Sequence, residues 1–209
     1  MGMRIHELHP SLIHAPLTLL PAASLVDLWA ASRRDLRLGH FGRGLWVAGA
    51  ATGLFAGLAG MAASQEVDLD HKPSADVVYL HGMLNLTILG AATGAMFWRR
   101  SHRPTVVSGA LGLAACGLAL WSAYLGGEAV YGQGVGIKAI ADQPKTDASP
   151  PLFSREAPRI LLADAARGFR WLMRRTWALL RRQDALDRQA VLRSPVDDDF
   201  RDEDRDDGP

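Results

Sequence analysis

Two histidines occupy matching places in the sequence. His14 opens the stretch HAPLTL and His81 opens HGMLNL, so each begins the pattern HxxLxL within a long apolar segment. Asn85 lies four residues after His81, and Thr18 lies four residues after His14, which puts each polar side chain one helical turn away on the same face. An imidazole whose one nitrogen is held by such a neighbour can present its other nitrogen to a metal. If the pattern marks a duplicated helix pair, the two helices are parallel neighbours and His14 faces His81.

Facing imidazoles from two membrane helices can supply both axial ligands of a b-type haem. The first hypothesis is therefore a haem site with His14 and His81 as ligands and Asn85 as the residue that positions a ligand. A transition metal bound by some of His9, His14, His81 and Glu128 is an alternative, as is a quinone headgroup hydrogen-bonded there. The opposing hypothesis is that the histidines only satisfy backbone and interhelical hydrogen bonds. On a continuous helix His9 and His14 diverge, because five residues correspond to about 500° of rotation.

Four apolar segments have to position these side chains. Each is close to the roughly 20 residues that cross a bilayer core about 30 Å thick. Average composition, 48% hydrophobic with a net charge of +1, resembles that of a soluble protein, but the apolar residues are segregated into these segments. The sequence thus predicts an all-α integral membrane four-helix bundle within 1–138. The predicted spans are 12–31, 44–63, 77–98 and 106–125.

Charges in the connecting links predict the orientation. Basic residues gather after the first and third spans, whereas the link after the second span is acidic. Short basic links remain in the cytoplasm, so the protein is expected to be multi-pass in the cell inner (plasma) membrane with both termini extracytoplasmic. Asp27, near the cytoplasmic end of the first span, is expected to form an ion pair with Arg33 and Arg34. Interfacial aromatic residues are expected at Trp29, Trp46 and Trp98 on the inner side, and at Tyr79, Trp121 and Tyr124 on the outer side.

The C-terminal third of the chain has a different character. Residues 139–158 are rich in proline and predict a linker, and 159–192 have the spacing of a basic amphipathic helix lying at the bilayer surface. Trp171 and Trp177 are expected near the lipid headgroups. Nucleic-acid binding is the competing function for a basic helix, and an extracytoplasmic location disfavours it. Residues 193–209 are predicted to be a disordered acidic tail.

Three sequence motifs resemble those of a bacterial family of predicted four-helix membrane proteins, domain of unknown function 2231. They are HPSLIHAPL, HGMLNL and GGEAVYGQGVG, and the resemblance extends over about residues 6–138. The family has no assigned activity. Relatives occur fused to or beside c-type cytochromes and Rieske proteins, so the resemblance implies a redox context with cytochromes or other redox membrane proteins as partners. The family pattern falls here on His9, His14, His81, Asn85, Gly126, Gly127, Glu128 and Tyr131.

Two functions remain open at this point. One is a haem- or metal-binding accessory of a membrane redox system that uses the outer histidines. The other is a non-catalytic structural or partner-docking membrane subunit without a cofactor. The sequence contains no nucleophile paired with a base, no phosphate-binding loop and no carboxylate pair at an active-site spacing, so an enzyme is not expected.

Overall fold

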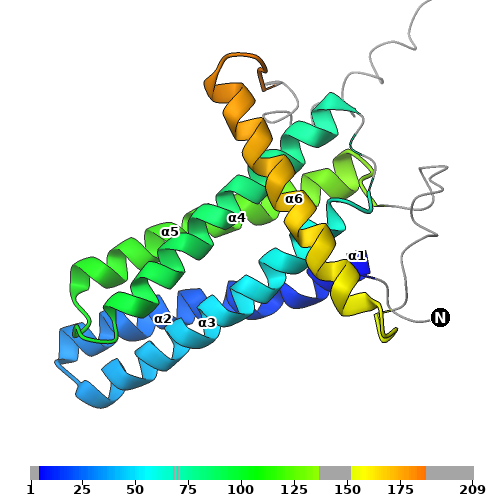
Figure 1. The fold of residues 1–209 in the computed structure, drawn as a ribbon. Coiled ribbons are helices and arrows are strands. Elements are labelled where there is room, and N and C mark those ends of the chain that lie inside the picture. Colours follow the sequence, from blue (N-terminus) through cyan, green and yellow to red (C-terminus); the bar gives the residue numbers. More distant parts are fainter. Residues whose placement is uncertain (1–4, 68, 70, 137–151, 187–209) are drawn as a thin grey trace, which may run out of the picture.

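The computed structural model describes residues 5–67, 69, 71–136 and 152–186, and this part of the chain is helical without strands (Figure 1). Four helical stretches are long and apolar enough to cross a membrane, the first of them formed by α1 and α2 together. The predicted all-α membrane bundle with a further C-terminal helix is therefore confirmed. The elements are α1 (Ile5–Leu12), α2 (His14–Arg33), α3 (Leu36–Ala63), α4 (Lys72–Trp98), α5 (Val106–Gly127), the π-helix η1 (Glu128–Gly132) and α6 (Ala157–Leu180).

Several helices differ in extent from the segments that the sequence predicted. Helix α3 begins at Leu36 rather than at 44, because Asp35 caps it by accepting from the backbone N–H groups of Arg37 and Leu38. Helix α6 begins at Ala157 and ends at Leu180. Most of the predicted linker, the last residues of the predicted amphipathic helix and the predicted acidic tail lie outside the described residues.

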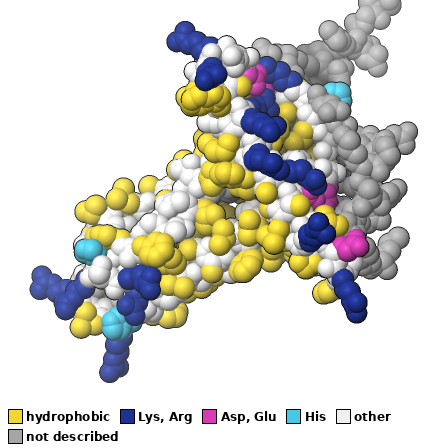
Figure 2. Space-filling view, in the orientation of Figure 1, with side chains coloured by type: hydrophobic (Ala, Val, Ile, Leu, Met, Phe, Trp, Pro, Cys, Tyr) yellow, Lys and Arg dark blue, Asp and Glu magenta, His cyan; other side chains and the backbone are white. Residues whose placement is uncertain are grey.

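Helices α2 to α5 pack as a four-membered ring. Helix α2 packs against α3 and α5, and α4 packs against the same two helices, so α2 and α4 occupy one diagonal of the ring. Helix α1 packs on α3, and α6 crosses the bundle near the end of α3 and the start of α4 (Figure 1). We call this end the α6 end. The opposite end holds the turn between α2 and α3 and the link 99–105, and we call it the basic end because arginines gather there (Figure 2).

The closest contacts between helices occur at glycines, which have no side chain. A Cβ atom on Gly49 would lie 2.6 Å from Cδ2 of Leu20, and one on Gly109 would lie 2.5 Å from Cγ of Leu28. These distances are shorter than any normal carbon contact, so helix α2 can approach α3 and α5 this closely only at glycine. Packing through small residues is the usual way in which membrane helices associate.

Apolar side chains cover much of the outer surface of the bundle (Figure 2). Phe55 on α3 is 63% exposed, and Leu120 on α5 is 72% exposed. In water such a surface would be unfavourable, whereas in a bilayer these side chains contact lipid tails. Trp29, Trp98, Trp121 and Tyr124 are likewise exposed, but Trp46 and Tyr79 are buried and do not serve as the interfacial anchors that the sequence predicted.

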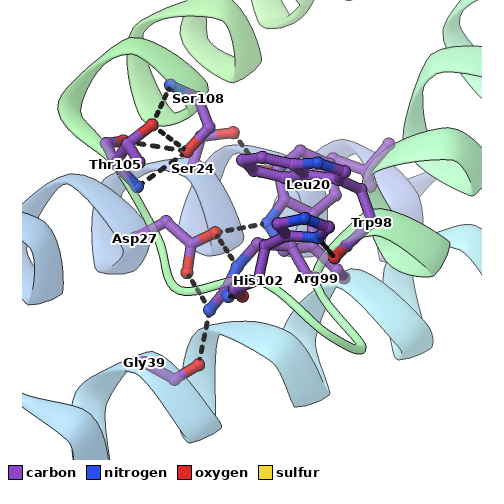
Figure 3. Close-up of polar contacts among 10 residues, drawn as sticks. Leu20, Ser24, Asp27, Gly39, Trp98, Arg99, His102, Thr105 and Ser108 are labelled. Atoms are coloured by element: carbon purple, nitrogen blue, oxygen red, sulfur yellow. Dashed lines mark hydrogen bonds and ion pairs between the residues drawn. The ribbon is translucent and has the colours of Figure 1, made fainter.

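A buried ion pair joins three helices near the basic end (Figure 3). Nε of Arg99 lies 2.8 Å from Oδ2 of Asp27, and Nη2 lies 3.2 Å from Oδ1, so the guanidinium binds the carboxylate through two nitrogens. The indole N–H of Trp46 donates to the same carboxylate at 2.9 Å. Arg99 also donates to the carbonyls of Gly39 and His102. Asp27 and Arg99 are 1% and 5% exposed, so both charges depend on these partners.

The predicted partners of Asp27 were wrong. Arg33 and Arg34 are exposed at the C-terminal end of α2, whereas the carboxylate points into the bundle toward α3 and the end of α4. Gly42 allows this, because a Cβ there would collide with Oδ1 of Asp27. Asp27 therefore connects helices inside the bundle and does not form an ion pair at its surface.

Removing one side of this ion pair should destabilise the bundle. Asp27→Ala leaves the guanidinium of Arg99 buried without its counter-ion, and we expect a loss of about 3–5 kcal/mol in the free energy of unfolding. Unfolding of the full chain in detergent micelles, followed by circular dichroism, measures this. Arg103→Ala, at an exposed arginine of the same link, is the control and should change little. The double variant Asp27→Leu/Arg99→Met should lose less stability than Asp27→Ala. Equal stability of the unaltered chain and the three variants would contradict the role assigned to the ion pair.

Candidate functional site

His81 lies in the N-terminal half of α4, toward the α6 end, and both of its ring nitrogens have partners. Nδ1 lies 2.7 Å from the backbone carbonyl of Ser122 on α5. A carbonyl only accepts, so Nδ1 carries the hydrogen and the neutral ring keeps a lone pair on Nε2. The amide Nδ2 of Asn85 donates to that lone pair at 3.0 Å. His81 is thus satisfied as a neutral imidazole that connects α4 to α5.

His9 makes the equivalent connection from α1. Its Nδ1 lies 2.9 Å from the backbone carbonyl of Ala56 on α3. The ring meets that of His81 edge to face, with the centroids 6.1 Å apart and the planes at 80°. Nε2 of His9 has no hydrogen-bond partner among the described residues. The two imidazoles therefore sit together at the α6 end, and one of their four nitrogens retains an unused lone pair there.

A glycine on the neighbouring helix provides space for each ring. A Cβ atom on Gly60 would lie 2.9 Å from Cε1 of His9, and a Cβ atom on Gly126 would lie 2.9 Å from Cε1 of His81. Any larger residue at either position would collide with the imidazole ring that the glycine now contacts. The pair is thus held by two hydrogen bonds to carbonyls and by two close glycine contacts, and we call His9, His81, Asn85, Gly60 and Gly126 the histidine cluster.

His14 does not face His81. The chain is helical on both sides of Ile13, which itself has α-helical angles, so His9 and His14 diverge around the axis. His9 turns into the bundle and His14 turns outward, where it is exposed. The order of helices in the ring also separates His14 from His81, because α2 and α4 lie on a diagonal and are not neighbours. The expected contact of Asn85 with His81 is present, whereas the hydroxyl of Thr18 donates to the backbone carbonyl of His14.

Glu128 is buried, and no ion pair joins its carboxylate to either imidazole among the residues that the structure describes. It opens η1, its side chain lies over Gly132, and Nε2 of Gln133 approaches Oε1 at 3.5 Å. No three His, Cys, Asp or Glu side chains form a group that could hold a metal ion within the part of the chain that the structure describes. Of the predicted metal ligands His9, His14, His81 and Glu128, the structure brings His9 and His81 together, and metal binding by some of the four stays a prediction.

The glycine-rich motif that begins in the last turn of α5 has separate roles along its length. Gly126 supports His81, while nothing lies within 4 Å of the position that a Cβ atom on Gly127 would occupy. Gly134 and Gly136 have φ angles of 68° and 80°, a left-handed conformation that glycine adopts without strain. Tyr131 is 84% exposed and does not join the histidine cluster.

A second buried ion pair attaches α6 to the bundle, and sequence reasoning missed it. Arg175 pairs with Asp76 at the start of α4, and the exposures of these side chains are 11% and 0%. The guanidinium also lies over the rings of Tyr79, at 5.4 Å, and Trp171, at 5.7 Å. The hydroxyls of Tyr79 and Thr176 are 3.0 Å apart. Helix α6 is therefore docked on α4 through specific polar contacts.

Asp184 adds an exposed contact just beyond α6. It lies 3.3 Å from Nζ of Lys72 and 3.5 Å from Nε of Arg175. The backbone N–H of Ala185 is the main cause that lowers the pKa of this carboxyl, and Lys72 and Arg175 lower it further. Asp184 therefore stays ionised at neutral pH and connects the end of α6 to the start of α4.

Comparison with known families agrees with the fold. The sequence model of a family described as "Predicted membrane protein (DUF2231)" matches residues 5–139. The chain belongs to the DUF2231 family. No curated protein and no solved structure matches it. The matched region of this DUF2231 protein contains the four spans and the whole histidine cluster, and it ends before α6.

The different surroundings of Gly126 and Gly127 give a test of the histidine cluster in this DUF2231 protein. Gly126→Ala places a methyl group against the ring of His81 and should lower the free energy of unfolding by about 1–3 kcal/mol. Gly127→Ala meets open space and is the matched control, expected to be neutral or stabilising because alanine favours the helix. Thermal unfolding in detergent compares the two. Equal effects would show that the close contact with His81 has no energetic role.

Proposed function

We propose that this protein is a non-catalytic membrane subunit, a rigid four-span scaffold that holds α6 across one end of the bundle as a docking element. The observation that carries the proposal is the state of His81, whose two ring nitrogens are both used inside the protein, by Ser122 and Asn85. Buried polar groups used in this way fix helices in one arrangement. The buried ion pair of Arg175 with Asp76 fixes α6 on the bundle in the same way.

We further propose that the α6 end is extracytoplasmic. The exposed arginines at the basic end, in the links and in the adjoining helix turns, support this orientation, because short segments rich in arginine stay in the cytoplasm. They include Arg33, Arg34, Arg37, Arg43, Arg100 and Arg103. On this orientation the histidine cluster and α6 face the outer side of the plasma membrane, as the sequence predicts.

Cysteine labelling tests the orientation directly. Cys116 is the only cysteine, so Cys116→Ala provides a background without thiols. Phe153→Cys, which replaces a side chain that is 92% exposed near the start of α6, should react with a membrane-impermeant maleimide on intact cells. Ser101→Cys, at the basic end, should react only after the cells are opened. The reverse pattern would place α6 in the cytoplasm.

A redox accessory is the second candidate, and His9 is the observation that favours it. Its Nδ1 donates to a backbone carbonyl, the arrangement common among ligating histidines, and its Nε2 has no partner among the described residues. His81 would act as a second ligand only after Asn85 releases its Nε2. The original ligand set of His14 and His81 with Asn85 stays a prediction, but the geometry favours His9 over the exposed His14. Association with cytochromes or other redox membrane proteins belongs to this second candidate.

One set of measurements separates the two candidates. The full chain purified from membranes should show no Soret band in a reduced-minus-oxidised spectrum and no stoichiometric transition metal by elemental analysis. His81→Ala should lower the free energy of unfolding by about 1–3 kcal/mol, because Asn85 and the carbonyl of Ser122 lose their partner. His14→Ala, the matched exposed control, should stay within about 0.5 kcal/mol. A Soret band or bound metal that disappears in His9→Ala would instead establish the redox accessory.

A further inference from the structure

Helix α6 presents three different faces. Gly168 and Leu172 pack on the bundle, and Gly168 approaches the backbone carbonyl of Met61 so closely that no Cβ would fit. A second face is apolar and exposed, and a third face beside it is lined with arginines (Figure 2). The exposed apolar residues are Leu162, Phe169, Trp177 and Leu180. The exposed arginines are Arg159, Arg167, Arg170, Arg174 and Arg181.

A cleft of about 320 Å³ opens where the arginine face meets the end of α3. This volume is at the lower end of the range of about 300–1,000 Å³ that is usual for small-molecule sites. Three arginines contribute to its lining, together with one amide and one indole. The lining residues are Gln65, Arg167, Arg170, Trp171 and Arg174.

The positive charge in the cleft is only partly compensated. Arg167 pairs with Asp164 on its own helix, and Nε of Arg170 donates to the carbonyl of Ala166 at 3.3 Å. Arg174 makes no hydrogen bond or ion pair with any residue that the structure describes. Guanidinium groups bind phosphate oxygens through paired N–H groups, so an anion carrying a phosphodiester fits this lining.

The position of the cleft selects among phosphate-bearing ligands. Gln65 follows the last turn of α3, where the apolar span ends, so the cleft lies at the depth of lipid headgroups. Trp171 packs edge to face on Tyr79, with the centroids 6.4 Å apart, and a tryptophan of this kind suits the interface. The exposed apolar face of α6 lies beside the arginines, where acyl chains would cover it.

We propose that this cleft binds the headgroup of an acidic phospholipid, with Arg167, Arg170 and Arg174 around the phosphate and the acyl chains along the apolar face of α6. The inference goes beyond the proposed scaffold, because a scaffold requires no lipid ligand. Basic clefts at membrane surfaces recognise acidic headgroups in this way. The bound lipid would fix α6 at the interface in addition to Arg175 and Asp76.

Native mass spectrometry of the full chain in dodecyl maltoside micelles tests the proposal. The probes are phosphatidylglycerol and phosphatidylcholine, added in parallel titrations. Phosphatidylglycerol should bind with one high-affinity site per chain and phosphatidylcholine should not. Arg170→Gln/Arg174→Gln should weaken phosphatidylglycerol by about tenfold or more, since two charge-assisted contacts are lost. Arg159→Gln/Arg181→Gln, with the same change in net charge on the same helix but outside the cleft, should bind as the unaltered chain does.

Several results would overturn the proposal. Equal binding of both lipids, or equal loss in the two double variants, would mean that no site exists in the cleft. Displacement of the lipid by inorganic phosphate at equal concentration would mean that the cleft recognises a free anion. Displacement by a single-stranded oligonucleotide at equal concentration would point to nucleic acid instead. Both double variants change exposed side chains, and matching circular dichroism melting curves will verify that they fold alike.

Discussion

Hydrocarbon offers no hydrogen-bond partners, so every polar group that this bundle buries must find its partner within the protein, and the ion pair of Asp27 with Arg99 is where this requirement is strongest. The carboxylate comes from α2, the guanidinium from the end of α4, and the indole of Trp46 from α3 completes the contact. Helices on the diagonal of the ring are thereby connected across its centre. The same rule operates at the other end, where His9 and His81 donate to carbonyls of α3 and α5.

Small residues make these polar contacts geometrically accessible. Gly42 admits the carboxylate of Asp27, and Gly60 and Gly126 admit the two imidazoles. In each case the glycine lies on a different helix from the side chain that it accommodates. Packing and polar satisfaction therefore depend on the same positions, and a substitution at one of these glycines disturbs both.

Length and hydropathy were sufficient to predict the four spans, because crossing a bilayer requires long apolar helices whatever their packing. The contact of Asn85 with His81 was also predictable, since residues four apart on a helix share a face. The partners of Asp27 and His81 were not, because they depend on which helices become neighbours in the ring. The sequence predicted that His9 and His14 point in different directions around the helix. Which of the two points into the bundle depends on how the helices pack, which the sequence alone did not show. Arg175 could have been found, as it shares the bundle-facing side of α6 with Gly168 and so needs an acidic partner.

The position of Arg99 in the chain has a consequence for biosynthesis. Asp27 enters the membrane with the first helix, long before Arg99 emerges after the third span. Until then the hairpin of α2 and α3 carries a carboxylate without its counter-ion, and it gains full stability only when α4 has been inserted. Assembly of the four spans is therefore coupled in time, because the carboxylate on the first span stays without its counter-ion until the chain has been made as far as Arg99.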